Sequence, residues 1–241
     1  MIKLTLLAFL LAIGNYSIGN NKSNHSEKYI DIDEIPKANI DFAPVFQHKT
    51  PDNKRKNDTL RYRKNVYSIY KWLGKEDEPL GNFNVYSFAF FAHNKPLFSK
   101  DSVYMHNPVH VSKDSSKFLF SYFNSVDGEE TPYGSILFAD IKSGKTISIE
   151  AFKPVDGPFI NNGHTFIFAE DNTVYSYDIA KNTKKTLFHL VSSNPFTIIN
   201  LKMLDDEKTL RVMLSNDEGE DHTCTGMDIN IISSLNQGKR E

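Results

Sequence analysis

The sequence predicts an all-β fold, a β-propeller-like repeat of short antiparallel strands, with a β-sandwich as the alternative. Three observations lead to this class. A unit made of a polar turn and two strands recurs, short apolar strands are separated by polar turns, and no long stretch follows the 3.6-residue period of a helix. A chain of 241 residues is long enough for one sizeable core.

The recurring unit occupies residues 112–146 and 161–186 and, more weakly, residues 205–229. Each copy begins with a polar turn, continues with an apolar strand and ends in a second strand that carries an aspartate. These aspartates are Asp140, Asp178 and Asp228, and we expect each to close a turn. Repetition at roughly 40 to 50 residues is typical of a propeller, and the chain has room for about five blades.

The N-terminus has the pattern of a signal peptide. A basic start at Lys3 precedes the apolar run Leu4–Ile13, which has about half of the ~20 residues that a membrane-spanning helix needs. We interpret residues 1–19 as a signal peptide and expect a secreted or periplasmic chain without a stable membrane anchor. The alternative is a buried N-terminal strand or helix. A single cysteine, Cys224, excludes an intramolecular disulfide, which favours a bacterial periplasm over eukaryotic secretion.

Residues 20–59 are polar and contain three prolines, which indicates a flexible leader with possible edge strands at residues 29–35 and 42–46. The propeller-like domain follows over residues 60–236, and residues 237–241 form a tail. Its first strand covers residues 60–73. The next strands are expected at residues 85–92, 96–99 and 103–105, separated by tight polar turns.

Residues 112–120 resemble the blade turn of the secreted WD40-like and TolB-like β-propeller families, in which Ser-Pro-Asp-Gly precedes a lysine and an apolar strand. Here Lys113 replaces the proline and Ser115 replaces the glycine. Residues 136–144 resemble the strand that ends such a blade. The resemblance extends over residues 112–229 and implies a propeller fold, although the sequence contains no Trp-Asp dipeptide.

No complete motif for a catalytic metal or nucleophile occurs in the sequence. His106 and His110 have the spacing of helical ligands, but a proline between them breaks the helix and the zincin glutamate is missing. His222 lies near Cys224, yet an unpaired cysteine is more often a small buried residue. The acidic run at residues 216–221 is more typical of a solvated turn than of a calcium loop. We therefore expect no cofactor, with calcium as the weak alternative.

Cations and aromatic residues alternate over residues 49–72. Such side chains together bind sugars, phosphates or an acidic protein face. The candidate binding residues are Arg61, Arg63, Tyr67, Tyr70 and Trp72. The alternative is structural, because in a closed ring this basic segment would meet the acidic last third of the chain.

These observations predict an exported non-catalytic binding protein, not an enzyme, that recognises a protein or glycan partner through its loops. The formal net charge of −2 argues against nucleic acid as a partner. One alternative is a glycan- or ester-hydrolysing enzyme with carboxylates in a central channel. A further alternative is a periplasmic immunity protein against a secreted toxin.

Overall fold

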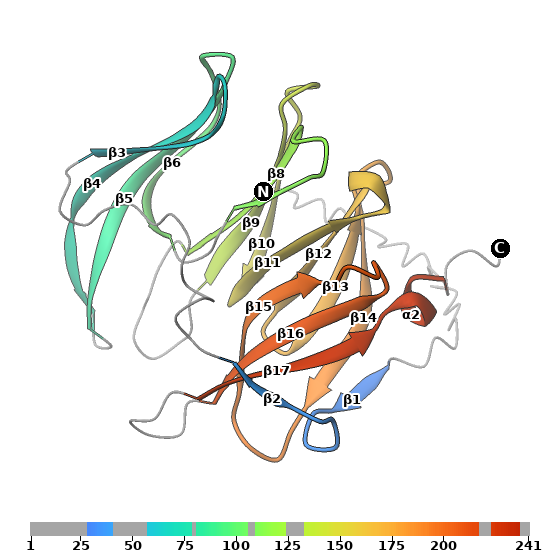
Figure 1. The fold of residues 1–241 in the computed structure, drawn as a ribbon. Coiled ribbons are helices and arrows are strands. Elements are labelled where there is room, and N and C mark those ends of the chain that lie inside the picture. Colours follow the sequence, from blue (N-terminus) through green and yellow to red (C-terminus); the bar gives the residue numbers. More distant parts are fainter. Residues whose placement is uncertain are drawn as a thin grey trace, which may run out of the picture.

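The computed structural model describes residues 28–40, 57–78, 81–105, 109–123, 133–216 and 223–236, and these are almost entirely β-strand (Figure 1). The predicted all-β class is confirmed. The strands are β1 (Tyr29–Asp31), β2 (Ala38–Ile40), β3 (Asn57–Arg63), β4 (Val66–Glu78), β5 (Gly81–Ala92), β6 (Lys95–Met105), β7 (His110–Val111), β8 (Lys117–Phe123), β9 (Tyr133–Asp140), β10 (Thr146–Phe152), β11 (Pro154–Ile160), β12 (Thr165–Glu170), β13 (Thr173–Asp178), β14 (Thr183–Val191), β15 (Thr197–Met203), β16 (Thr209–Asn216) and β17 (Thr223–Asn230). Two short helices are η1 (Asn161–Gly163) and α2 (Ile232–Asn236).

The predicted signal peptide, residues 1–19, lies outside the described residues. Neither helix in the described part of the chain has the length and apolar character that crossing a membrane requires.

The described strands form three sheets. The first has the order β10-β9-β8-β6-β5-β4-β3, with β7 also paired to β8. The second is β1-β14-β13-β12-β11, and the third is β15-β16-β17-β2. Paired strands are antiparallel apart from β1, which lies parallel to β14. Short connections explain this pattern, because an antiparallel pair can be joined by a tight turn.

Each copy of the recurring unit lies in a different sheet. The opening turns precede β8, β12 and β16, and the second strands are β9, β13 and β17. Strand β11, at the edge of the second sheet, contacts β8 and β9 of the first sheet and β15 at the edge of the third. The three sheets therefore pack on one another along β11, in a propeller-like manner. The expectation of about five blades needs correction for the described residues, because β3 to β6 extend the first sheet instead of forming a separate one.

Two of the three repeat aspartates close turns. Asp140 and Asp178 accept hydrogen bonds from backbone N–H groups of the residues that follow them. Asp228 does not, because β17 continues past it, and its carboxylate instead receives two 2.7 Å hydrogen bonds from Arg211 on β16. Asn230 at the end of β17 takes the turn position and accepts the N–H of the second residue after it.

Aromatic side chains fill the contact between β5 and β8. Phe90 lies 5.2 Å from Phe118 and 4.9 Å from Phe120, measured between ring centroids, and Phe88 lies 5.6 Å from Phe120. All four rings are fully buried. Burying such a side chain stabilises the fold by about 1.5–3 kcal/mol. A second aromatic cluster includes Phe138 of β9, and an aliphatic cluster joins the second sheet to the third.

Residues 28–40 form what we call the N-terminal strap, because they add one strand to each of two sheets. β1 lies at the edge of the second sheet, and β2 pairs with β17 of the third. Between them, the N–H of the buried Ile32 donates to the Val191 carbonyl at 2.9 Å. The Asp33 carboxylate accepts hydrogen bonds from the hydroxyl groups of Ser192 and Ser193, each at 2.8 Å. Part of the expected flexible leader therefore ties two sheets together.

Candidate functional site

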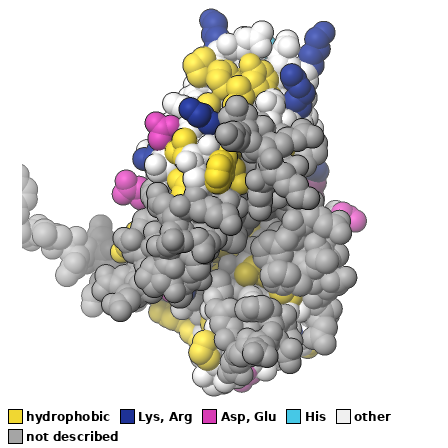
Figure 2. Space-filling model, turned by 90° about the vertical axis from the view of Figure 1, so that its left-hand side faces the viewer, with side chains coloured by type: hydrophobic (Ala, Val, Ile, Leu, Met, Phe, Trp, Pro, Cys, Tyr) yellow, Lys and Arg dark blue, Asp and Glu magenta, His cyan; other side chains and the backbone are white. Residues whose placement is uncertain are grey.

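The residues predicted to bind a partner do not form one surface. Arg61 and Tyr67 are opposite each other on β3 and β4, and the Arg61 guanidinium carbon lies 5.5 Å from the centre of the Tyr67 ring. Tyr67 stacks on Phe91 of β5 with ring centroids 5.1 Å apart. Figure 2 views the molecule from this side and shows hydrophobic side chains near the top with Lys and Arg around them.

The other predicted binding residues belong to the opposite side of the sheet. Tyr70 is 2% exposed and packs against Phe88, so it is not available to a partner. Alternate side chains of a strand point to opposite faces, which places Tyr70 on the core side. Trp72 is half-buried against the same cluster, and Arg63 donates to the Ser115 carbonyl at 2.7 Å. These contacts support the packing of the first sheet.

Among the candidate metal and thiol residues, the structure describes His110 and Cys224. His110 Nε2 lies 3.6 Å from Oδ2 of the buried Asp156. Cys224 is buried, and burial raises the pKa of its thiol. His106, His222 and residues 217–221 of the acidic run lie outside the described residues. Within the described ranges, no three His, Cys, Asp or Glu side chains gather in a way that could hold a metal ion.

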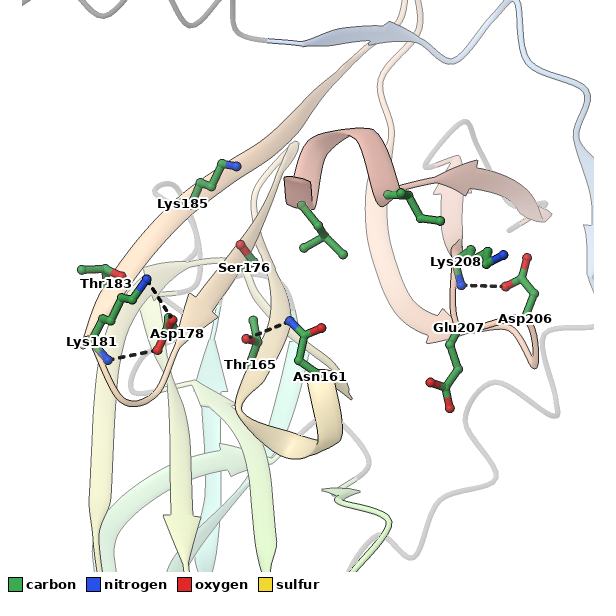
Figure 3. A pocket seen from close by; sticks show the side chains of 12 residues that line it. Asn161, Thr165, Ser176, Asp178, Lys181, Thr183, Lys185, Asp206, Glu207 and Lys208 are labelled. Atoms are coloured by element: carbon green, nitrogen blue, oxygen red, sulfur yellow. Dashed lines mark hydrogen bonds and ion pairs between the residues drawn. The ribbon is translucent and has the colours of Figure 1, made fainter. Parts of the chain in front are cut away.

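A pocket of about 570 Å³ lies between the second and third sheets, beside α2 (Figure 3). Its walls are the turns before β12, β14 and β16, together with parts of the strands that these turns join. The described lining residues are Asn161, Thr165, Ser176, Asp178, Lys181, Thr183, Lys185, Asp206, Glu207, Lys208, Ile232 and Leu235. Ten of the twelve are polar or charged, whereas Ile232 and Leu235 of α2 give the pocket one apolar side.

One wall of the pocket carries Asp178 at the end of β13. Its Oδ1 accepts the backbone N–H groups of Ala180 and Lys181, both at 3.0 Å. The Lys181 ammonium lies 3.9 Å from Oδ2. Side chains of Asp favour such turns because the carboxylate can accept N–H groups two and three residues further on. The turn therefore fixes the position of the carboxylate.

The other wall carries Asp206 and Glu207 in the turn between β15 and β16 (Figure 3). Asp206 accepts the hydroxyl of Thr209 at 2.6 Å and the backbone N–H groups of Lys208 and Thr209, both at 2.9 Å, and these hydrogen bonds lower its pKa. Glu207 has a left-handed backbone conformation, with φ 52°. Its side chain forms an exposed ion pair with Lys113 of the turn before β8.

Between these walls lie neutral polar groups. Thr165 and Ser176 are largely buried on β12 and β13, and Asn161 Nδ2 donates to the Thr165 hydroxyl at 3.3 Å. Figure 3 shows Thr165 and Asn161 between Asp178 and Glu207. Hydroxyl and amide groups between carboxylates are suited to a polyhydroxylated ligand, because each can donate and accept hydrogen bonds.

Sequence reasoning placed Asp178 and Asp206 in turns but did not bring them together. Asp178 and Asp206 are 28 residues apart in the chain, and their turns belong to different copies of the recurring unit. The two turns meet only because the second and third sheets pack side by side. The available signal was the repeat itself, because the turn that opens one copy and the turn that closes another lie at the same end of their antiparallel strand pairs.

Comparisons with protein-family models and with curated proteins gave no match. Among solved structures, the chain is similar to an α-L-arabinofuranosidase mutant from Fusarium graminearum in complex with an iminosugar inhibitor, at 7% identity and a TM-score of 0.41. That alignment covers 74% of this chain and 58% of the other. An α-L-arabinanase from Penicillium chrysogenum in complex with arabinobiose follows, at 12% identity, a TM-score of 0.39 and coverage of 73% and 57%. U3-55K is similar at 13% identity, a TM-score of 0.36 and coverage of 73% and 56%.

Two of these three structures bear the names of enzymes, which runs against the expectation of a non-catalytic binding protein that is not an enzyme. We correct that expectation here. The burial of Tyr70 also removes part of the surface on which it depended. The chain spans just over half the length of each of these structures, and likeness at this level assigns neither activity nor substrate to it.

Proposed function

We propose that the chain is a glycan hydrolase whose substrate occupies the pocket between the second and third sheets. The observation that carries the proposal is the presence of Asp178 and Glu207 on opposite sides of this pocket, with hydroxyl and amide groups between them (Figure 3). A pocket of about 570 Å³ lies in the range of small-ligand sites, roughly 300–1,000 Å³.

Hydrolysis of a glycosidic bond needs one carboxyl group that protonates the leaving oxygen and one carboxylate that activates water or attacks the sugar. Glu207 is the proposed acid, because its exposed ion pair with Lys113 is weak and can be exchanged for a contact with substrate. Asp178 is the proposed base, because two backbone N–H groups hold it in place. Asp206 is bonded through both oxygens and acts as a fixed negative charge beside the substrate.

Ester hydrolysis is less well supported by the same residues. The described lining contains no histidine or cysteine, so it lacks the base that activates a serine in most such enzymes. Lys185 donates to the Ser234 carbonyl at 2.7 Å, with no hydrogen bond to the neighbouring Ser176. The carboxylates therefore carry the proposed chemistry.

The test is release of reducing sugar from a panel of polysaccharides and nitrophenyl glycosides by the purified chain. Glu207→Gln and Asp178→Asn should each lower kcat roughly 100- to 10,000-fold, the usual contribution of a general acid or base. Asp205→Asn is the matched control, because Asp205 is exposed in the same turn but does not line the pocket. No release from any substrate, or equal rates for all three variants, would refute the proposal.

We also propose that the chain is exported, on the basis of the basic start and apolar run of residues 1–19. N-terminal sequencing of the chain recovered from its own cells tests this. A start after residue 13 is expected, and a start at Met1 on the mature protein contradicts export by this route. The finer resemblance to WD40-like and TolB-like families remains a proposal that rests on residues 112–144.

A further inference from the structure

One lysine of the pocket has no carboxylate partner in the described part of the chain. Lys181 lies 3.9 Å from Asp178, and the charge of Lys208 acts on Asp206. Lys185 is half-buried on β14, and its Nζ donates to the backbone carbonyl of Ser234 at 2.7 Å. Figure 3 shows this side chain directed toward α2. The pocket therefore holds a fixed ammonium group whose charge is not neutralised by an ion pair among the described residues.

Two hydroxyl side chains lie on the same face of the second sheet as Lys185. Ser176 is directly opposite Lys185 in the pairing of β13 with β14, so the two side chains lie on the same face of the sheet. Ser176 is 7% exposed and lines the pocket, as does Thr183 two residues before Lys185 on the same face of β14. A cation flanked by hydroxyl groups can bind an oxyanion through one ionic and two neutral hydrogen bonds.

Partial burial makes this cation receptive to an anion. Removing an ammonium group from water is unfavourable unless an opposite charge or good hydrogen bonds replace the water. Burial lowers the pKa of Lys185, so the charged form of this side chain is disfavoured relative to water. An anion beside Lys185 favours the charged form and would reverse this effect.

We propose that Lys185, Ser176 and Thr183 form a subsite for a singly charged anionic substituent of the substrate, a carboxylate or a sulfate ester. One cation without a carboxylate partner matches one negative charge. The substrate of the proposed hydrolase is then an acidic glycan, and this statement of substrate class rests on the proposed function. The apolar side chains of Ile232 and Leu235 border the pocket and can cover the less polar face of a sugar ring.

The test compares the binding of three matched probes by calorimetry: an oligogalacturonide, the same oligosaccharide as its neutral methyl ester, and a sulfated oligosaccharide of equal length. We expect at least one anionic probe to bind about tenfold or more tightly than the methyl ester. The anionic probe that binds identifies the substituent as carboxylate or sulfate. Equal affinity for all three probes would overturn the subsite.

Variants of the pocket residues show whether Lys185 causes the preference for the anionic probe. Lys185→Met should abolish the preference for the anionic probe, and Lys185→Arg should keep it, because arginine retains the positive charge. Since Lys185 also contacts α2, Ser176→Ala is a second variant that leaves the 2.7 Å bond to Ser234 in place and should weaken the preference in part. A preference that persists in Lys185→Met chains with native circular dichroism contradicts the proposal.

Different results would refute the hydrolase activity and the anion subsite. Binding of an anionic probe that depends on Lys185, without release of sugar from any substrate, refutes the hydrolase and leaves the subsite standing. Release of sugar from neutral glycans, with equal affinity for charged and neutral probes, refutes the subsite and leaves the hydrolase standing.

Discussion

The hydroxyl of Ser121 on β8 donates to the carboxylate of Asp156 on β11 at 2.5 Å, and both residues are buried. The bond crosses from the first sheet to the second, where β8 and β11 contact each other. His110 on β7 lies 3.6 Å from the other carboxylate oxygen. The Asp156 carboxylate thus lies close to side chains of β8 and β7 at the contact between the two sheets, and we expect it to stabilise that contact.

Ser121→Ala should destabilise the fold by about 1–3 kcal/mol, because it leaves a buried carboxylate oxygen with one donor fewer. Denaturant unfolding monitored by circular dichroism measures this change. Ser148→Ala is the matched control, since Ser148 is exposed on β10, and surface substitutions usually change stability by less than about 0.5 kcal/mol. Equal stability of the two variants would show that the Ser121 hydroxyl contributes nothing.

Gly157→Ala should also weaken the contact between sheets. An added Cβ would lie 2.8 Å from the Ile167 carbonyl oxygen and 3.1 Å from Leu201 Cβ, so β11 would have to move away from β12 and β15. Overpacking of this kind costs about 1–3 kcal/mol, and the rigid carbonyl suggests the upper end. The melting temperature should fall accordingly.

Gly144→Ala provides the comparison for that variant. Gly144 has φ 72°, and an added Cβ would meet nothing within 4 Å, so only backbone strain of about 1 kcal/mol is expected. A smaller effect at Gly157 than at Gly144 would contradict the close approach of β11 to its neighbours.

Acid should release the N-terminal strap. Hydrogen bonds from the Ser193 backbone N–H and from the hydroxyl groups of Ser193 and Ser192 lower the pKa of Asp33 to about 2, from an ordinary value of 3.8. Because the folded-state pKa is lowered, the stabilisation is present above about pH 4 and is lost as the pH falls toward 2. Hydrogen exchange of the Ile32 amide, corrected for the intrinsic rate, should therefore accelerate within this window.

Asp33→Ala should remove the pH dependence of hydrogen exchange at the Ile32 amide, so that exchange is fast both above about pH 4 and near pH 2. Glu34→Gln, an exposed neighbour in the same strap, should keep it. Exchange that is independent of pH in the unaltered chain would show that Asp33 does not hold the strap.

Cys224 should not react with iodoacetamide in the native chain. The thiol is buried, and burial raises its pKa from the ordinary value of 9.0, so both access and the thiolate fraction are low. Mass spectrometry should find no adduct on the native protein and one adduct after denaturation, since the sequence contains a single cysteine. Rapid native alkylation would contradict the burial of this side chain.

Local patterns were sufficient for most strands of the fold. Alternation of side chains and polar turns predicted strands near β5, β8, β12 and β13, because these signals depend only on residues close in sequence. The single strand expected over residues 60–73 is instead the hairpin of β3 and β4, and the two strands expected at residues 96–99 and 103–105 are one strand, β6. The parallel pairing of β1 with β14 could not be predicted in this way. Its partners, such as Tyr29 and His189, are far apart in the chain, and no local signal specifies such a register.

The candidate site was less accessible to sequence reasoning than the fold. Both faces of β4 carry aromatic residues, so the sequence could not tell that Tyr70 packs inward while Tyr67 faces Arg61. Lys185 lies in the second copy of the recurring unit, where no local pattern marks it as a binding residue. Its ammonium group is held by α2, whose Ser234 carbonyl accepts a hydrogen bond from it although the two residues are 49 positions apart in the chain.

By itself, the sequence determined the all-β class, the recurrence of turn and hairpin, and the turn positions of Asp140 and Asp178, because these follow from backbone preferences over a few residues. Only the tertiary structure decided which turns share a pocket, which aromatic side chains are buried and which cation lacks a carboxylate partner in the described chain. These features arise from the packing of one sheet on another, and that packing joins residues that no local pattern connects.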